Sequence, residues 1–86
     1  MPRLSEFYGI AIYMYYRDHA PPHIHAIYGD DEASIDIATG AVMAGRLPNR
    51  ARALVEAWVS THRTALQKDW DLAAVSQPLL PVPPLD

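Results

Sequence analysis

The sequence contains no cysteine, which excludes disulfides, thiolate zinc sites, iron–sulfur clusters and thiol nucleophiles. A lack of cysteine fits a reducing cytosol, so we expect a cytoplasmic protein. Residues 1–9, MPRLSEFYG, carry no long apolar run, so neither a signal peptide nor a transmembrane helix is expected, and no membrane partner. The net charge of −3 argues against a surface coated with positive charge for nucleic acid.

The length and the apolar pattern together predict one small α+β domain. Eighty-six residues, half of them apolar, are enough for a single core. Aromatic and β-branched segments bounded by turn residues predict about four antiparallel strands. These are expected over residues 7–17, 23–28, 31–37 and 41–44. Residues 50–73 follow the 3.6-residue period and predict one long C-terminal helix that covers one face of the sheet.

The apolar stripe of this helix is expected to contain Ala51, Leu54, Val55, Trp58, Thr61, Ala65, Leu66 and Trp70. The domain is expected to occupy residues 1–75, followed by an arm over residues 76–86. The arm, SQPLLPVPPLD, holds four prolines and is expected to be extended. Its leucines and Val82 are expected to dock either on their own domain or on a neighbour.

The histidines concentrate in one stretch, DHAPPHIHAIYG, at residues 18–29. His23 and His25 are two apart on a predicted strand and therefore point to the same side. A two-residue turn at residues 29–30 pairs His25 with Ser34 and His23 with Asp36. The intervening Ile24 then faces the core, and the histidines are expected on the outer, solvent-accessible face beside Asp36.

Three interpretations of this face remain open. His23 and His25 could serve as acid and base for metal-independent phosphodiester transfer, with Asp36 or Asp18 as the orienting carboxylate. A His-x-His pair also suits zinc, nickel or iron if His19 or Asp18 supplies a third ligand. No fourth strong ligand lies at a typical spacing, so no metal ligands are assigned from the sequence. The third interpretation is structural, with the prolines fixing a turn and the histidines lying on an ordinary polar face.

Positive charge gathers before and within the start of the predicted helix, at Arg46, Arg50 and Arg52. A helix N-terminus already attracts anions, so these arginines indicate an anionic partner, either phosphate or the carboxylates of a protein. Arg17 and Tyr28 lie in or beside the histidine stretch and are further candidates for binding. Tyrosines on the side of the sheet away from the helix are candidates for an interface.

The central motif D-H-x-P-P-H-x-H-A-x-Y-G, with the I-D-I-x-T-G turn and a G-x-L-P segment, resembles bacterial domain-of-unknown-function family 4160. The resemblance covers residues 2 to about 75, and Ala20 stands where the family often has proline. It implies an α+β domain, often encoded beside a small protein of uncharacterised family 2442. Such pairs are regarded as type II toxin–antitoxin modules, with this family in the toxin (DhiT-like) role. No cofactor is implied.

Two hypotheses about function follow. The first is a toxin-like component bound by a cognate antitoxin-like protein of family 2442, with metal-independent RNA cleavage as its activity. His23 and His25 would then be acid and base, and Arg17, Arg46 or Arg50 would contact phosphate. The second is a non-catalytic interaction module that docks through its sheet and proline-rich arm, including the formation of homo-oligomers.

Overall fold

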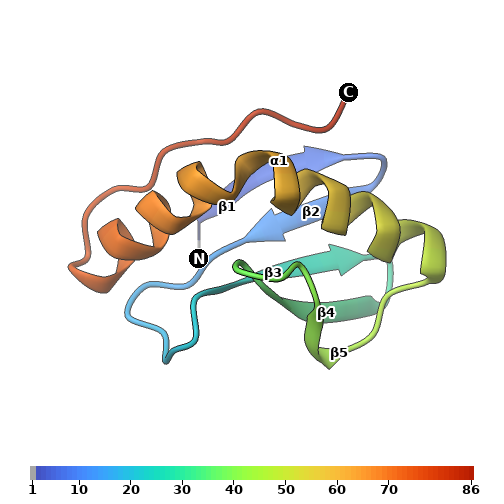
Figure 1. Cartoon of the computed structure of the whole chain (residues 1–86), viewed down its shortest axis with the longest axis horizontal. Helices are drawn as coiled ribbons and strands as arrows, with labels where there is room; N and C mark the ends of the chain where they lie inside the picture. The colour runs from blue at the N-terminus through green and yellow to red at the C-terminus, as the bar shows by residue number, and fades with distance from the viewer. Residues whose placement is uncertain (1) are drawn as a thin grey trace.

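Residues 2–86, which the computed structural model describes, form a five-stranded antiparallel sheet crossed on one face by a long helix (Figure 1). The strands follow each other in chain order across the sheet. Their bounds are β1 Arg3–Phe7, β2 Ile10–Tyr13, β3 His23–Tyr28, β4 Asp31–Asp36 and β5 Val42–Gly45, and helix α1 spans Asn49–Ala74. The predicted α+β class is confirmed, with one strand more than expected.

The additional strand arises at the N-terminus. The prediction of one long strand over residues 7–17 is wrong, because two strands lie in this part of the chain. Tyr8 and Gly9 instead adopt φ values of 50° and 78°. Two successive residues with positive φ make the kind of tight turn that suits the twist of a hairpin. β1 and β2 therefore pair with each other, with Phe7 opposite Ile10.

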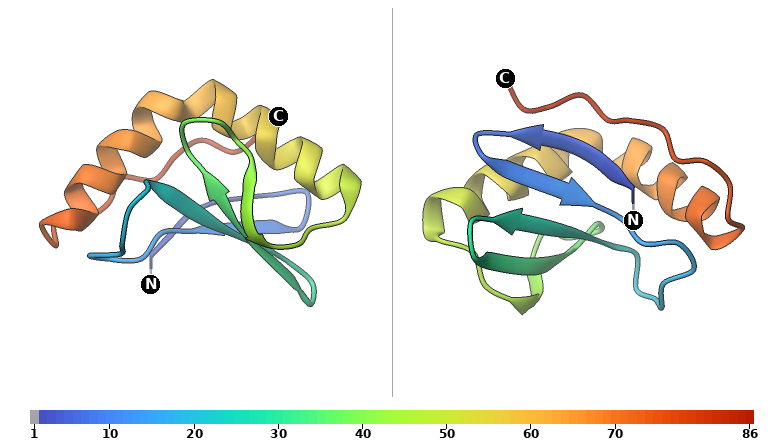
Figure 2. Two further views of the ribbon diagram at one scale, coloured as in Figure 1. Left: turned by 60° about the horizontal axis from the view of Figure 1, so that its bottom comes forward. Right: turned by 180° about the vertical axis from the view of Figure 1, so that it is seen from behind.

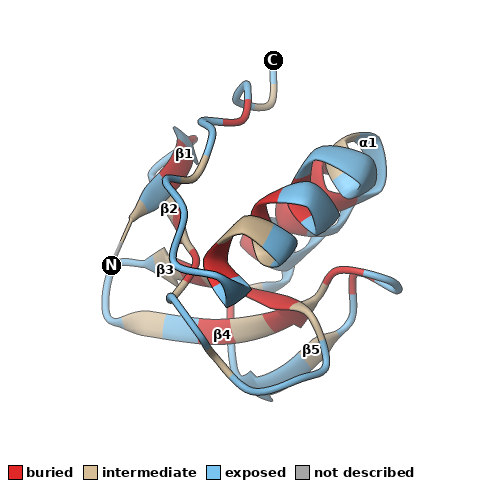
Figure 3. Cartoon of the chain, turned by 90° about the vertical axis from the view of Figure 1, so that its left-hand side faces the viewer, coloured by how far each residue is buried: buried red, intermediate tan, exposed pale blue. Residues whose placement is uncertain are grey.

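The second hairpin has the register that the sequence predicts. A turn at residues 29–30 pairs Tyr28 with Asp31, His25 with Ser34 and His23 with Asp36. One side of β1 to β4 supplies the core against the helix, and the buried segments line this interface in Figure 3. Its largest fully buried side chains are Trp58, Ile10, Ile12, Met14, Ile24, Ile35, Ile37 and Leu66.

Helix α1 is kinked at His62, whose φ and ψ of −114° and 23° are not helical. The hydroxyl of the preceding Thr61 donates to the carbonyl of Ala57, a bond that often accompanies a bend. The kink gives the helix the arched path over the sheet seen in Figure 2. Thr61 and Ala65, which were expected in the apolar stripe, are exposed, whereas Val59 and Leu66 beside them are fully buried.

The C-terminal arm is extended and runs back past α1 and β1 (Figures 1 and 2). Its Val82 is buried, and the Val82 N–H donates to the carbonyl of Leu4 at 2.9 Å. The indole N–H of Trp58 donates to the carbonyl of Pro83 at 2.8 Å. Of the two expected docking modes, the arm uses its own domain. No helix within residues 2–86 has the length and apolarity needed to cross a membrane.

Candidate functional site

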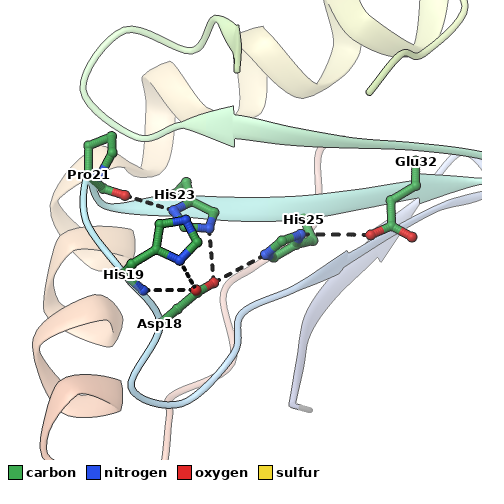
Figure 4. Close-up of polar contacts among 6 residues, drawn as sticks. All are labelled: Asp18, His19, Pro21, His23, His25 and Glu32. Carbon is green, nitrogen blue, oxygen red and sulfur yellow. Dashed lines mark hydrogen bonds and ion pairs between the residues drawn. The ribbon is translucent and has the colours of Figure 1, made fainter. Parts of the chain in front are cut away.

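Four side chains of the histidine stretch meet at one end of the sheet, and we call them the histidine–aspartate cluster: Asp18, His19, His23 and His25 (Figure 4). His23 and His25 project from the same side of β3. Asp18 and His19 come from the loop that joins β2 to β3 and folds back over this end of the sheet. The cluster therefore combines two side chains of a strand with two side chains of the loop that precedes it.

The Asp18 carboxylate lies at the centre of the cluster. Its Oδ2 is 3.0 Å from Nε2 of His23 and 3.5 Å from Nε2 of His25. Its Oδ1 is 3.0 Å from Nδ1 of His19 and accepts a 2.8 Å hydrogen bond from the His19 backbone N–H. One carboxylate is thus in contact with three imidazoles.

The far sides of the two strand histidines also face oxygen atoms. Nδ1 of His23 is 2.7 Å from the carbonyl of Pro21. Because a carbonyl only accepts, this nitrogen carries the proton. Nδ1 of His25 is 3.8 Å from Glu32 Oε2 and makes no hydrogen bond within residues 2–86. Both rings are therefore oriented with Nε2 toward Asp18.

Burial differs sharply across the cluster. The side chain of His23 is 3% exposed and that of His25 13%, whereas His19 is 85% exposed. The expectation of two solvent-accessible imidazoles is wrong for His23. Its ring packs 5.2 Å from Trp70, which the C-terminal half of the kinked helix brings to this end of the sheet, and Tyr15 meets the His25 ring edge-on at 4.3 Å.

The electrostatics favour an ionised Asp18. Burial by itself raises the pKa of this carboxyl group. Hydrogen bonds from the His19 backbone N–H and the His25 ring act in the opposite direction, as do the electrostatic interactions with His23 and His19. Together they hold the pKa of Asp18 below its ordinary value. Burial, with the negative charges of Glu32 and Asp18, raises the pKa of the Tyr15 hydroxyl.

Asp36, expected as an orienting carboxylate, does not take that role. It lies opposite His23 in the register, but its Oδ1 accepts a 3.0 Å hydrogen bond from the backbone N–H of Thr39. An aspartate that begins a tight turn commonly satisfies the turn's own N–H groups in this way. Asp18 therefore replaces Asp36 beside the imidazoles.

The arginines expected to hold phosphate are not beside the two strand histidines. At about 3.3 Å per residue, Tyr28 lies roughly 16 Å from His23 along β3. Arg50 lies at the Tyr28 end, and Arg46 joins it there through a 3.8 Å contact with Asp31. Arg52 is exposed in the first turn of α1.

Arg17 is the exception, since it directly precedes Asp18. It is exposed, with a φ of 51°, and its backbone N–H donates to the carbonyl of Ala73 at the end of the helix. This bond ties the loop of the cluster to α1.

A second feature lies at the Tyr28 end of the sheet, and we call it the tyrosine–arginine hollow. It encloses about 230 Å³ and is lined by Tyr8, Ile10, Tyr28, Pro48, Arg50, Ala51 and Leu54. Tyr8 and Tyr28 are 55% and 40% exposed, so two aromatic side chains stand open to solvent beside one guanidinium group. Tyr28 and Arg50 were binding candidates from the sequence, whereas Tyr8 was missed because the first turn was missed.

Other contacts of the cluster were also missed. Glu32 is the diagonal neighbour of His25 once Ser34 is placed opposite it, so the hairpin register carried a usable signal. Trp70 gave no such signal, because the kink at His62 decides where the last turns of the helix lie. The carbonyl of Pro21 could not be assigned from residue types.

The arrangement can share a proton, or hold a cation, between two ring nitrogens and one carboxylate oxygen. It cannot present both imidazoles to a bulky substrate while His23 is buried under Trp70 and the loop. His19 is the one imidazole of the cluster that is fully open to solvent. The cluster is therefore suited to binding protons, small ions or water rather than a large substrate.

The fold and the cluster define the class, a small α+β domain whose D-H-x-P-P-H-x-H motif folds into one polar centre. A family model described as a domain of unknown function (DUF4160) matches residues 9–71, and the protein belongs to that family. The match includes the whole cluster and most of α1, and ends before the C-terminal arm. No curated protein and no solved structure shows a match.

Proposed function

We propose that this protein is the toxin-like member of a cytoplasmic two-protein module and that a small acidic partner protein holds it inactive by binding it. The observation that carries this proposal is the tyrosine–arginine hollow. Tyrosine and arginine are, with tryptophan, the side chains enriched among residues that dominate binding energy at protein interfaces. The motif's resemblance to toxin-like members of two-gene modules points to the same kind of partner, a protein of family 2442.

The hollow suits an apolar side chain with a carboxylate beside it. Its lining is mostly apolar, and about 230 Å³ is enough for one large anchoring side chain. Arg50 forms no ion pair within residues 2–86 and lies in the first turn of α1, where the helix dipole adds to its attraction for anions. Arg46 is partly neutralised by Asp31, so Arg50 is the principal charged contact that we assign.

RNA cleavage by His23 and His25 is less well supported by this geometry. The imidazole of His23 is buried, Asp36 points elsewhere, and Arg46 and Arg50 lie at the other end of β3. A net charge of −3 also gives RNA little long-range attraction. The hypothesis of docking through the proline-rich arm is also less well supported, because the buried Val82 and the Trp58–Pro83 hydrogen bond hold the arm on its own domain.

The test is expression of the chain in a bacterial host with and without the product of the adjacent gene, followed by titration of the purified pair. We expect growth inhibition only without the partner, and a one-to-one complex. Tyr28→Ala and Arg50→Glu should each weaken that complex about 30-fold or more, the effect of losing about 2 kcal/mol. Lys68→Glu, an equal charge change elsewhere on α1, should leave affinity unchanged.

The outcomes separate the alternatives. Unchanged affinity in both Tyr28→Ala and Arg50→Glu would show that the partner docks elsewhere. Normal growth in both strains, with no complex, would overturn the two-protein module itself. Binding of a single-stranded RNA that depends on Tyr28 and Arg50, without partner binding, would reassign the hollow to nucleic acid. Self-association lost in Tyr28→Ala would reassign it to a homodimer.

A further inference from the structure

We propose that Asp18, His23 and His25 form a binding site for one divalent first-row transition-metal ion, with Zn²⁺ as a representative. One carboxylate oxygen and two imidazole nitrogens lie within 4.8 Å of one another. This inference concerns the opposite end of β3 from the tyrosine–arginine hollow, so it stands or falls independently of the proposed partner binding.

The distances within the cluster are close to those of a formed site. Two ligand atoms about 2.1 Å from a tetrahedral zinc ion lie about 3.4 Å from each other. Asp18 Oδ2 is 3.0 Å from His23 Nε2 and 3.5 Å from His25 Nε2. Only small side-chain rotations are needed to place an ion between these three atoms (Figure 4).

The hydrogen bonding of His23 supplies an independent argument. Its Nδ1 donates to the Pro21 carbonyl at 2.7 Å, so in the neutral ring Nε2 is an unprotonated acceptor. That lone pair faces Asp18 Oδ2, another acceptor, at 3.0 Å. Two facing acceptors need a positive species between them, either a proton or a metal ion. A backbone carbonyl on the far nitrogen is also the usual outer contact of a metal-bound histidine.

His25 repeats this orientation. Its Nε2 turns toward Asp18, and its Nδ1 turns toward the carboxylate of Glu32 at 3.8 Å. A negative charge on this side of the ring favours the electron-donating character of the opposite nitrogen, and a rotation that shortens the contact would give the usual carboxylate–histidine pair of a metal site. His23 is therefore fixed from behind by a hydrogen bond, His25 faces a carboxylate there, and the Nε2 atoms of both rings are directed at Asp18.

Burial makes the site preorganised. The side chains of His23, His25 and Asp18 are 3%, 13% and 16% exposed, so little side-chain freedom is lost on binding. His19, 85% exposed and in contact with Asp18 Oδ1, is the solvent-exposed member of the cluster. Two nitrogens and one oxygen suit Zn²⁺, Co²⁺ or Ni²⁺, whereas Mg²⁺ and Ca²⁺ prefer oxygen ligands throughout.

Calorimetric titration of the untagged full-length chain with ZnCl₂ tests the site. We expect one ion per chain, no heat with MgCl₂, and a higher melting temperature in excess Zn²⁺ because the ion binds the folded state. His25→Gln and Asp18→Asn should each lower Zn²⁺ affinity by about 100-fold or more, exceeding the loss usual for an outer-shell partner. His62→Gln, which removes the one histidine outside the cluster, should bind as the wild type does.

A second measurement needs no variant and so does not depend on how the variants fold. In ¹⁵N–¹H spectra of the wild-type imidazoles, Zn²⁺ should shift the Nε2 signals of His23 and His25 and leave those of His62 in place. Absence of one-to-one binding would overturn the proposal, as would binding that survives in both His25→Gln and Asp18→Asn. Unmoved Nε2 signals at saturating Zn²⁺ would show that a proton occupies the position instead.

Discussion

Asp18 is the residue on which the cluster depends, because it is the one carboxylate shared by three imidazoles. Residue types and strand parity predicted that His23 and His25 would point the same way and that a carboxylate would accompany them. They did not distinguish Asp18 from Asp36, since that choice depends on how the loop of residues 14–22 folds. In the structure Asp36 accepts from the Thr39 N–H of its own turn, and the loop aspartate is the one that meets the histidines.

Replacing Asp18 by Asn should change how the free energy of unfolding depends on pH. The pKa of Asp18 is lowered in the folded state, so its ionised form adds stability above the ordinary value of 3.8, and this contribution is lost as pH falls through the lower folded pKa. We expect Asp18→Asn to cost about 2 kcal/mol at pH 7 in chelator and much less at pH 2. Urea unfolding at the two pH values measures this, and an equal loss at both would contradict it.

Asp69 should behave in the opposite sense. It is 1% exposed, its Oδ1 accepts a 2.8 Å hydrogen bond from the Leu80 N–H, and its Oδ2 has no partner within residues 2–86. Burial raises the pKa of this carboxyl group, although the Leu80 N–H and Lys68 act against the rise. Stability from Asp69 is therefore complete below about pH 3.8 and is lost as pH rises through the raised pKa.

An Asp69→Asn variant keeps the acceptor for Leu80 and removes the buried charge. We expect it to be more stable than the wild type at pH 7, by about 1 kcal/mol, and to show little gain at pH 3.5. Denaturant titrations at both pH values provide the measurement. A variant that is less stable at pH 7 would show that the carboxylate makes a favourable contact in the folded chain.

At the scale of elements, the sequence predicted a hairpin correctly where its turn is made of common turn residues. The Gly29–Asp30 turn fixed the β3–β4 register, and the alternation of Ala33, Ile35 and Ile37 was confirmed as buried. The Tyr8–Gly9 turn was not recognised, because tyrosine is a poor signal for positive φ and apolar residues continue on both sides. The first strand and half of the hollow's aromatic pair were lost with it.

Two glycines with positive φ make a matched test of the sheet. A Cβ on Gly29, at φ 59°, would meet nothing within 4 Å, whereas one on Gly45, at φ 75°, would lie 2.2 Å from the backbone oxygen of Glu32. Gly29→Ala should cost about 1–2 kcal/mol, from backbone strain alone. Gly45→Ala should cost about 3 kcal/mol or more, because β4 and β5 must also separate. Equal losses in thermal unfolding would contradict this reading of the β4–β5 contact.

At the scale of the whole molecule, the arm completes the core. The family match ends at residue 71, yet Val82 is buried. The Val82 N–H donates to the Leu4 carbonyl, and the Pro83 carbonyl accepts from the Trp58 indole N–H. The sequence predicted an extended arm and left open whether it docks on its own domain. That outcome depends on contacts of the arm with Leu4 of β1 and Trp58 of α1, which local sequence patterns do not describe.

Substitutions in the arm should therefore divide by position. Val82→Ala removes buried apolar atoms and should lower the free energy of unfolding by about 2 kcal/mol. Leu80→Ala, at a side chain that is 50% exposed, should change it by less than about 0.5 kcal/mol. Chemical denaturation of both variants gives the comparison. Similar small effects would mean that the arm contributes little to the stability of the domain.

The positions of the two tryptophans give the protein a pair of built-in optical probes. Trp70 lies 5.2 Å from the ring of His23, and Trp58 donates its indole N–H to the arm. A Trp58→Phe chain would fluoresce from beside the imidazoles alone, and a Trp70→Phe chain from beneath the arm alone. Events at the two places could then be timed separately by stopped-flow emission, with no dye attached.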